Sequence, residues 1–332
     1  MNLIDGYRYL AALAQQRHFG RAAAACHITQ PALSNALRAL EAQLGVAIVR
    51  RGRQYEGLTP EGERVLATAH RMLREQELLQ QALASSASTP CGRLVIGAVP
   101  TALPIAARFA AQLAERHAGL QPQLLSLASQ AIETGLDTLA IDIGLGYTER
   151  IATTHAGRLS AWPQYVEHYH LLRRTALPGT GLQFGEPMRW ADAATLRLCM
   201  LSPDMHNRAI LDAAFGSVGL RVQPALETNS VLALLAAVQG SGLAAVLPGA
   251  LVSTVAQQGG VEACPLVGPE LRTPIGFMTA AAAQPSRTLE AALALATSAT
   301  WLADAAAHSG PLRRLPGQSD TAPRQENVRE DL

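Results

Sequence analysis

The chain has 332 residues, enough for about two globular domains that each bury a core of their own. Apolar residues make up 48% of it, charged residues 16% and aromatic residues 4%, which excludes a chain that is disordered throughout, collagen-like or of low complexity. The net charge is only +1, yet residues 1–58 hold seven arginines against three carboxylates, a local excess of positive charge that suits contact with phosphates.

Membrane, secreted and metal-binding classes are also disfavoured. No apolar run reaches the roughly 18 residues that a bilayer-spanning helix needs. Residues 1–9 carry Asp5 and Arg8 and lack the basic and apolar regions of a signal peptide, so we expect a cytoplasmic chain. The four cysteines lie at least 65 residues apart and form no CxxC pair. We therefore expect buried free thiols, no metal site and no cofactor.

Three helices are predicted at the start of the chain. Residues 3–14 have the periodicity of a first helix, and residues 21–26 form a second, short helix after Gly20. The third begins at Thr29, a good N-cap, and is stopped by Gly45. Leucines recur along the third helix at spacings of three or four residues and predict a stripe that faces a core: Leu33, Leu37, Leu40 and Leu44.

A second face of this third helix is polar. Gln30, Ser34 and Arg38 follow one another every four residues, away from the leucine stripe. This arrangement is typical of the second helix of a helix-turn-helix, which lies in the DNA major groove, where glutamine pairs with adenine and arginine with guanine. An ordinary amphipathic helix with a solvated outer face has the same pattern, so the helix alone leaves both interpretations open.

Residues 48–58 are predicted to form a β-wing. A short apolar run leads to a basic tip and then returns, and the tip would lay Arg50, Arg51 and Arg53 along the phosphate backbone of DNA. The wing favours the DNA-binding interpretation of the helix before it.

A long helix is predicted from residue 61 to residue 84, after Thr59 as its N-cap. It contains no proline. Residues spaced alternately four and three positions apart form a heptad seam for pairing with a second chain: Val65, Ala69, Met72, Gln76, Leu79 and Leu83. A helix packed on its own domain is the alternative, because only three heptads are present. Gly62, in the first turn, either admits a close approach to DNA or is a tolerated weak position. Residues 85–90 supply a polar hinge.

Five spaced segments resemble the N-terminal signature of LysR-type transcriptional regulators: Arg21-Ala22-Ala23, Thr29-Gln30-Pro31-Ala32-Leu33-Ser34, Leu37-Arg38-Ala39-Leu40-Glu41, Leu44-Gly45 and Thr59-Pro60-Glu61-Gly62. The resemblance covers about 300 of the 332 residues. It implies a winged helix-turn-helix, a dimerising linker helix and an effector domain of two α/β subdomains similar to periplasmic solute-binding proteins. Asn35 stands where the family often has a basic residue, and Ile48-Val49 where Leu-Phe is more usual. The residues expected to contact DNA are Thr29, Gln30, Pro31, Ser34, Asn35, Arg38, Arg50, Arg51 and Arg53.

The C-terminal two hundred residues alternate short apolar runs with amphipathic helices. This order predicts a largely parallel sheet with crossover helices, behind an N-terminal domain rich in α-helix. The predicted domains are a winged helix-turn-helix at 1–58, a linker helix and hinge at 59–90, an effector domain at 91–307 and a disordered tail at 308–332. Within the effector domain, subdomain I takes about 91–165 and 268–307, and subdomain II about 166–267.

An effector site is expected at the carboxyl ends of the strands, where helix N-termini offer free N–H groups to an anion. Hydroxyls at Thr101, Ser129 and Ser202 follow predicted strands and suit a carboxylate, and the family places its effector in a cleft between the two subdomains. A helix N-cap without any ligand is an equally good interpretation of each hydroxyl. The full expected set is Pro100, Thr101, Ala102, Ser129, Gln130, Gly146, Tyr147 and Ser202.

Two further patterns are weak. His168 and His170 lie on one face of a predicted strand, but no third metal ligand is indicated, so a solvated strand edge is the better interpretation. The cysteine nearest to Cys199 is 65 residues away, which disfavours redox sensing by a close pair.

The leading hypothesis is therefore a sequence-specific transcriptional regulator of LysR type. Its expected partners are double-stranded operator DNA, a small effector such as a carboxylate, and further copies of itself in a homodimer or homotetramer. The alternative is a cytoplasmic small-molecule-binding protein of solute-binding fold without a DNA function. No paired nucleophile and base supports an enzyme.

Overall fold

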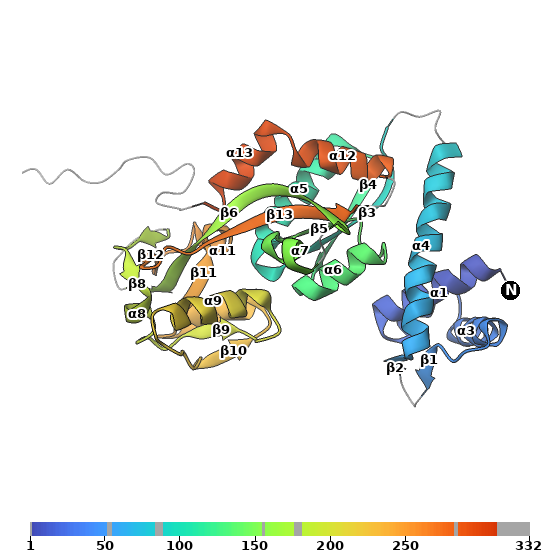
Figure 1. Ribbon diagram of the computed structural model, residues 1–332, viewed down its shortest axis with the longest axis horizontal. Coiled ribbons are helices and arrows are strands. Elements are labelled where there is room, and N and C mark those ends of the chain that lie inside the picture. The colour runs from blue at the N-terminus through green and yellow to red at the C-terminus, as the bar shows by residue number, and fades with distance from the viewer. Residues whose placement is uncertain are drawn as a thin grey trace, which may run out of the picture. The chain divides into compact units, whose positions relative to one another are not determined.

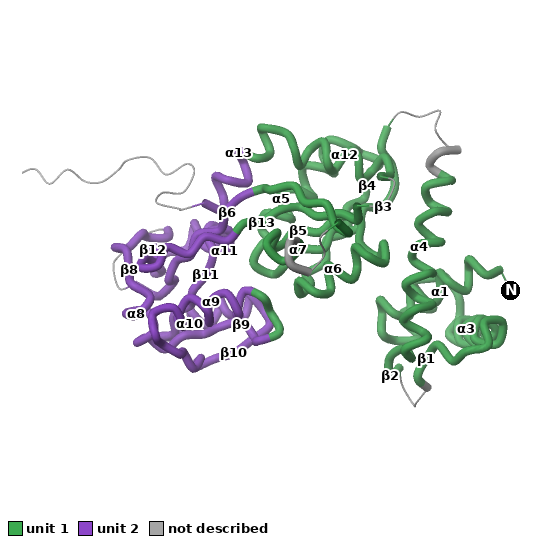
Figure 2. The backbone as a smooth tube through the Cα atoms, in the orientation of Figure 1, with its two compact units in different colours: residues 1–164, 204–206, 274–302 green, residues 165–203, 207–273, 303–332 purple. Residues whose placement is uncertain are grey.

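The computed structural model describes residues 2–51, 55–83, 89–154, 157–175, 181–281 and 285–310. Two compact units divide the chain (Figure 2). Unit 1 comprises residues 1–164, 204–206 and 274–302, and unit 2 comprises residues 165–203, 207–273 and 303–332. In the described parts of the chain, no helix is both long enough and apolar enough to cross a membrane. The predicted tail lies outside the described residues from residue 311 onward.

Unit 1 begins with the elements of a winged helix-turn-helix and a long helix (Figure 1): α1 (Leu3–Gln16), α2 (Phe19–Ala25), α3 (Gln30–Leu44), β1 (Val49–Arg51), β2 (Tyr55–Leu58) and α4 (Pro60–Leu83). The three predicted helices and the antiparallel wing are confirmed. The second helix begins earlier than predicted, because the His18 ring nitrogen accepts hydrogen bonds from the backbone N–H groups of Gly20 and Arg21. Gly20 therefore lies inside the first turn of α2.

The leucine stripe of α3 holds the core of this N-terminal module. Leu33 and Leu40 have no exposed surface, and they pack with Leu10 and Leu13 of α1 and with Ile48 before the wing. Leu44, the last residue of α3 and the end of the predicted stripe, is 37% exposed.

The rest of unit 1 is the first α/β subdomain. Strands β3 (Gly92–Ala98), β4 (Leu120–Ser126) and β5 (Ile143–Tyr147) are parallel, in the order β4-β3-β5, and β13 (Arg272–Ala280) runs antiparallel beside β5. The helical elements of this subdomain are η1 (Pro100–Ala102), α5 (Leu103–Arg116), α6 (Ser129–Asp137), α7 (Glu149–Thr154), α12 (Arg287–Ala296) and the start of α13 (Ala299–Ala307), which ends in unit 2. Figure 1 shows α5 and α12 over one face of the sheet and α6 over the other.

Aromatic packing marks the centre of this subdomain. The Phe109 ring lies 4.3 Å from Phe277 and 5.0 Å from Trp301, centroid to centroid. All three side chains are fully buried, and the Trp301 indole donates a hydrogen bond to Gln164 at 2.5 Å. The predicted strand and helix order is confirmed here, whereas the antiparallel β13 makes the sheet mixed rather than parallel throughout.

Unit 2 is a second α/β block. Its long strand β6 (Leu159–Arg174), which begins in unit 1, pairs antiparallel with β11 (Ala245–Pro248) and β12 (Val261–Val267). Two parallel strands, β9 (Cys199–Leu201) and β10 (Leu226–Thr228), form a separate small sheet. The core centres on Trp190 and Phe215, whose rings meet edge to face at 5.1 Å. The other elements are β7 (Gln183–Phe184), β8 (Met188–Arg189), α8 (Trp190–Ala193), α9 (His206–Ser217), α10 (Val231–Gly240), α11 (Gly249–Val252) and η2 (Ser253–Val255).

Candidate functional site

The polar face of α3 is open to solvent. Thr29 caps the helix by accepting a hydrogen bond from the backbone N–H of Ala32, as its position predicts. Gln30 and Arg38 are exposed, and Ser34 is half-buried between them. The helix thus keeps Leu33, Leu37 and Leu40 in the core and presents a row of hydrogen-bonding side chains outward.

Two further predicted DNA contacts lie beside this row. Pro31 and Asn35 are both exposed. The Arg38 guanidinium donates a hydrogen bond to the Asn35 side-chain oxygen at 3.1 Å. Asn35, which stands where a basic residue is usual, therefore orients the arginine one turn later along α3.

The wing is anchored to α3 by a contact that sequence reasoning missed. The Glu41 carboxylate accepts hydrogen bonds from the backbone N–H groups of Ile48 and Val49, at 2.9 and 3.1 Å. Glu41 thereby fixes where β1 begins relative to the polar face of α3. Arg50 is exposed on β1, whereas the Arg51 side chain and all of Arg53 lie outside the described residues.

The structure explains why residue 62 is a glycine, and the explanation differs from both interpretations of the sequence. The residue is buried, and a Cβ atom placed on it would lie 2.1 Å from the backbone oxygen of Ile48. Thr59 ties the same junction by donating a hydrogen bond to Ala47 at 2.6 Å and accepting one from the Gly62 N–H at 2.9 Å. The missing side chain lets α4 approach the wing closely.

The heptad seam predicted along α4 is partly wrong. Ala69 has no exposed surface and Val65 is partly buried, because both pack into the N-terminal core. Gln76 lines a cavity within unit 1. Met72 and Leu79, seven residues apart, are 42% and 59% exposed and remain available to a second chain, while the Leu83 side chain lies outside the described residues.

The effector candidates of unit 1 gather where β3 and β5 end. Thr101, with Pro100 and Ala102 in a buried 3₁₀ turn, is 1% exposed and shares a hydrogen bond with the Tyr147 hydroxyl at 3.0 Å. Gly146 is buried beside Met278. Thr101 thus has a partner within the protein, which reduces its availability to a ligand.

Ser129 differs from Thr101 in having no partner. It begins α6, is 8% exposed, and its hydroxyl oxygen makes no hydrogen bond within the described residues. Gln130, next to it, is exposed. In unit 2, Ser202 follows β9 and its buried hydroxyl oxygen likewise has no partner among the described atoms. A buried hydroxyl left unpaired is costly unless a ligand or water completes it.

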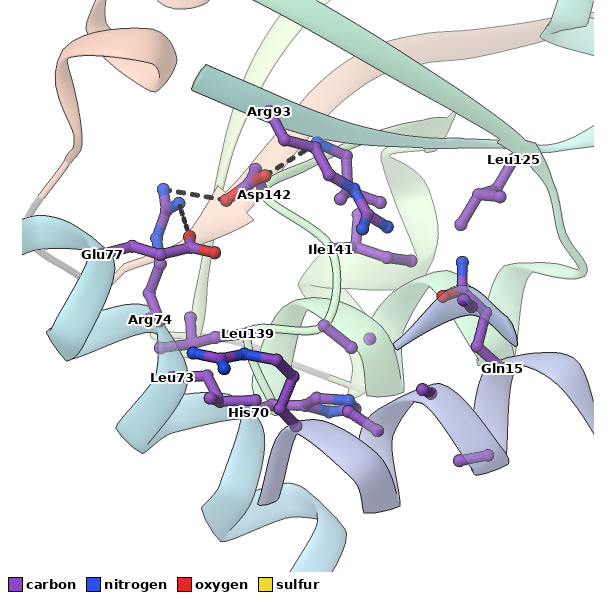
Figure 3. A pocket seen from close by; sticks show the side chains of 18 of the residues that line it. Gln15, His70, Leu73, Arg74, Glu77, Arg93, Leu125, Leu139, Ile141 and Asp142 are labelled. Carbon is purple, nitrogen blue, oxygen red and sulfur yellow. Dashed lines mark hydrogen bonds and ion pairs between the residues drawn. The ribbon is translucent and has the colours of Figure 1, made fainter. Parts of the chain in front are cut away.

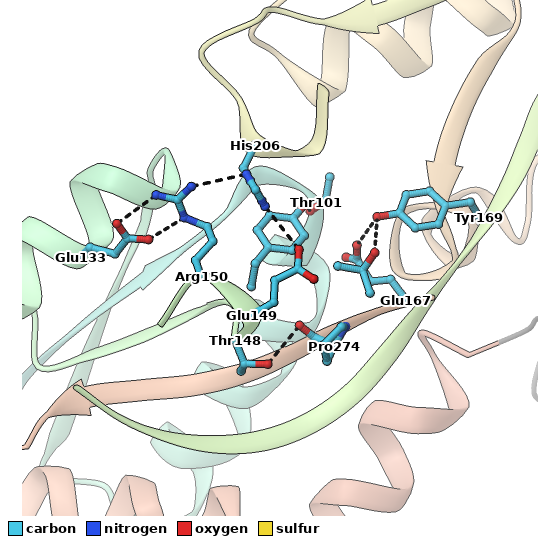
Figure 4. A network of polar contacts seen from close by, with 11 residues as sticks. Thr101, Glu133, Thr148, Glu149, Arg150, Glu167, Tyr169, His206 and Pro274 are labelled. Carbon is cyan, nitrogen blue, oxygen red and sulfur yellow. Dashed lines mark hydrogen bonds and ion pairs between the residues drawn. The ribbon is translucent and has the colours of Figure 1, made fainter. Parts of the chain in front are cut away.

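A polar network missed by the sequence analysis lies close to these candidates (Figure 4). Arg150 donates two hydrogen bonds to the buried Glu133 carboxylate, at 2.6 and 3.0 Å. His206 lies 3.5 Å from both Arg150 and Glu149, and its ring meets Tyr147 edge to face at 4.8 Å. Burial is the main cause that lowers the pKa of His206, which favours the neutral imidazole. The one signal in the sequence was Glu133, four residues after Ser129 on α6.

The histidine pair on β6 is not a solvated edge, which corrects the prediction. His170 is 1% exposed and Glu167 is fully buried, and at His170 the strand β6 pairs with β11 on one side and with β12 on the other. His168 lies 3.7 Å from Glu270. Across the described residues, no three His, Cys, Asp or Glu side chains are grouped so as to hold a metal ion.

The buried cysteines are poorly suited to redox chemistry. Burial raises the pKa of the Cys199 thiol to about 11, so the reactive thiolate is scarce at neutral pH. Its sulfur lies 3.4 Å from the backbone oxygen of Ala244, and Cys264 is buried as well. Cys91 is exposed and Cys26 is partly exposed, so the expectation of four buried thiols is wrong for these two.

Comparison with known proteins gives consistent results for both parts of the chain. Residues 4–63 match the family described as "Bacterial regulatory helix-turn-helix protein, lysR family", and residues 87–301 match "LysR substrate binding domain". The DNA-binding transcriptional dual regulator OxyR of Escherichia coli K12 is 40% identical over 104 residues, 31% of this chain and 34% of that protein. A probable hydrogen peroxide-inducible genes activator of Mycobacterium xenopi is 33% identical over 180 residues, 54% of this chain and 93% of that protein.

Solved structures share the fold over nearly the whole chain. A full-length OxyR variant from Pseudomonas aeruginosa has a TM-score of 0.65 at 22% identity and covers 93% of this chain and 96% of its own. CbnR in complex with its target DNA has a TM-score of 0.61 at 19% identity and covers 91% and 99%. The first curated relatives, by contrast, are matched over only about a third of their length, 34% for the E. coli protein.

Proposed function

The chain belongs to the LysR family of bacterial regulatory helix-turn-helix proteins, and from that membership we propose that it regulates transcription by binding operator DNA under the control of a small effector. The observation that carries the proposal is the division of α3 into a buried leucine stripe and an exposed row that includes Gln30 and Arg38. A solute-binding protein without a DNA function has no use for that row.

Each part of the module has a proposed role on DNA. Gln30 and Arg38 read base edges in the major groove, with Asn35 holding the arginine in position. Thr29, Pro31 and the half-buried Ser34 lie in the N-terminal half of α3, where backbone N–H groups suit phosphate oxygens. The wing arginines Arg50, Arg51 and Arg53 contact phosphates and make the affinity depend on salt.

A homodimer, or a tetramer built from dimers, completes the proposal. One small winged helix covers a single half-site, and paired modules cover two half-sites about one helical turn apart. The exposed apolar side chains of Met72 and Leu79 on α4 support pairing with the α4 helix of a second copy. We propose a binding function without a catalytic step, exerted in the cytoplasm.

A gel shift with a double variant tests the DNA-binding role. Ser34→Ala combined with Arg38→Ala should weaken binding to the specific operator about 5- to 150-fold, because a bidentate base contact is worth about 1–3 kcal/mol. Arg197→Ala is the matched control, since it removes one exposed arginine from unit 2 and should leave the affinity unchanged. Equal operator binding by the double variant and the wild type would exclude the proposed reading face.

A second part of the proposal concerns the effector. We propose that a small organic acid binds at the N-terminus of α6, where the Ser129 hydroxyl is buried without a partner. The match of residues 87–301 to a substrate binding domain supports a ligand in this region. Because Arg150 is paired with Glu133, the acid is held by neutral donors, the Ser129 hydroxyl and backbone N–H groups.

Thermal shift measurements with a panel of small organic acids, from formate to benzoate, test this site. An acid present at 100 times its dissociation constant should stabilise the protein by roughly 2.7 kcal/mol. Ser129→Ala should abolish most of that stabilisation, and Ser126→Ala, an exposed serine at the end of β4, should preserve it. An acid that stabilises Ser129→Ala as strongly as the wild type counts against the site.

A further inference from the structure

Arg74 joins the linker helix α4 to the first α/β subdomain through a buried contact (Figure 3). Its guanidinium lies 2.8 Å from the Asp142 carboxylate and donates a hydrogen bond to the Ser286 hydroxyl at 2.7 Å. The side chains of Arg74 and Asp142 are each only 9% exposed. Glu77, on the solvent side, lies 3.4 Å from the same guanidinium. A charge so little exposed needs its partner, because an unpaired buried charge is strongly destabilising.

Asp142 and Ser286, the two partners of Arg74, are each held in place by a hydrogen bond from a backbone N–H group. The second Asp142 oxygen accepts a hydrogen bond from the Val95 N–H of β3 at 2.7 Å. The Ser286 oxygen caps α12 by accepting from the Leu289 N–H at 3.2 Å. Burial is the main cause that raises the pKa of Asp142, and the nearby Arg74 lowers it in part. Both acceptors are therefore fixed by the subdomain before Arg74 reaches them.

Arg74, the donor in this contact, lies on a part of α4 that packs into the core of the DNA-binding module. Ala69, five residues before Arg74, is fully buried in the N-terminal core, and Leu66 and Leu73 pack against the same core. A movement of α4 at Arg74 must therefore carry α1 and α3 with it.

A cavity adjoins this contact between α4 and the subdomain. It has a volume of about 860 Å³ and is walled on one side by α1 and α4 and on the other by the subdomain, including Leu125, Leu139 and Ile141. Figure 3 shows Arg74, Glu77 and Asp142 linked at the edge of this space. The ion pair thus lines a space that the described side chains leave unfilled.

Strands β3 and β5 link the contact of Arg74 to the effector candidates, because the contact lies at one end of these strands and the candidates lie at the other. Asp142 directly precedes β5, which ends at Tyr147, and Val95 lies in β3, which leads to Thr101. Tyr147 and Thr101 are hydrogen-bonded to each other. A shift of β5 against β3 at the effector end therefore changes the geometry that Asp142 offers to Arg74.

We propose that Arg74, Asp142 and Ser286 form a latch that fixes the DNA-binding module to the first α/β subdomain, and that opening this latch is how the effector domain changes DNA binding. The existence of the latch is independent of the proposed function, and only its effect on DNA rests on it.

Hydrogen exchange measured by mass spectrometry on the full chain without DNA tests the latch itself. Asp142→Asn keeps an oxygen for the Val95 N–H but removes the charge that holds Arg74. We expect exchange in α4 around residues 70–83 to rise at least about tenfold, since breaking a buried pair leaves the other charge unpaired. Arg74→Gln should raise it similarly, and the double variant should add little, because both changes remove one interaction. Unchanged α4 exchange in both single variants overturns the latch.

Two control variants separate the latch from a general loss of structure. Asp137→Asn breaks an ion pair of similar length, 2.8 Å to Arg158, in the same subdomain but away from α4, and should leave α4 exchange unchanged. Glu77→Gln removes the exposed partner of Arg74 and should also have little effect. If Asp142→Asn speeds exchange in β13 and α5 as much as in α4, the subdomain has unfolded. The exchange of α4 in Arg74→Gln then decides: a rise supports the latch, and no change overturns it.

The regulatory half is tested by operator binding of the same variants. Asp142→Asn and Arg74→Gln should each change the operator affinity at least about fivefold relative to Asp137→Asn. An unchanged affinity with raised α4 exchange overturns the regulatory role. If the wild type itself binds no operator, the proposed function fails, while the exchange result still decides whether the latch exists.

Discussion

Replacing Gly62 by alanine is expected to destabilise the N-terminal module by about 1–3 kcal/mol and to abolish specific DNA binding. In most helices this substitution is favourable by about 0.5–1 kcal/mol, because alanine costs less backbone entropy than glycine. At Gly62 the new Cβ atom would lie 2.1 Å from the Ile48 backbone oxygen, and a backbone atom cannot swing aside as a side chain does. The helix and the wing must therefore separate.

The measurement is a pair of urea unfolding curves together with a gel shift. Gly216→Ala is the matched control, because Gly216 lies within α9 and a Cβ atom there meets nothing within 4 Å. That variant should be slightly more stable than the wild type and bind DNA normally. Equal stability of Gly62→Ala and Gly216→Ala would show that the close approach of α4 to the wing is not tight in solution.

Replacing Arg150 by methionine is expected to destabilise the first α/β subdomain by about 3 kcal/mol. The substitution leaves the Glu133 carboxylate, whose side chain is 7% exposed, without the two hydrogen bonds that it now accepts. Arg150 itself is 25% exposed, so water compensates part of the loss and the effect stays at the lower end of the range for buried pairs. Thermal unfolding of the variant measures the change.

A second substitution identifies the cause. Arg150→Met combined with Glu133→Gln removes the unpaired charge and should recover most of the lost stability. Arg158→Met breaks an ion pair whose arginine is 64% exposed, and should cost no more than about 1 kcal/mol. A double variant as unstable as Arg150→Met alone would mean that the packing of the arginine, and not its charge, stabilises the subdomain.

Features that depend on neighbours in the chain could be predicted from the sequence. The spacing of Leu33, Leu37 and Leu40 identified the core side of α3, and Thr29 identified its start. The opposite face, with Gln30 and Arg38, followed from the same helical period. The strand and helix order of the C-terminal region was also readable, because apolar runs and caps act over a few residues.

The burial and the hydrogen-bond partners of a side chain were harder to predict than whether its segment forms a helix or a strand. Thr101 and Ser129 both follow strands and both carry hydroxyls, yet the first is bonded to Tyr147 and the second is unpaired. His170 was expected at a solvated edge, but β11 and β12 cover its strand. The predicted heptad seam of α4 is wrong at Ala69, because this residue packs in the N-terminal core of its own chain and not against a second copy.

The sequence by itself therefore determined the DNA-binding module, the alternation of the α/β region and the family, since each rests on periodicity, caps and motifs within short segments. Only the tertiary structure decided why residue 62 must be glycine, that Glu133 pairs with Arg150, and that Arg74 meets Asp142 and Ser286. Arg74 and Ser286 are 212 residues apart, and no local pattern relates them. Such pairs form because folding brings charged groups out of water together, and the resulting burial depends on every element packed around them.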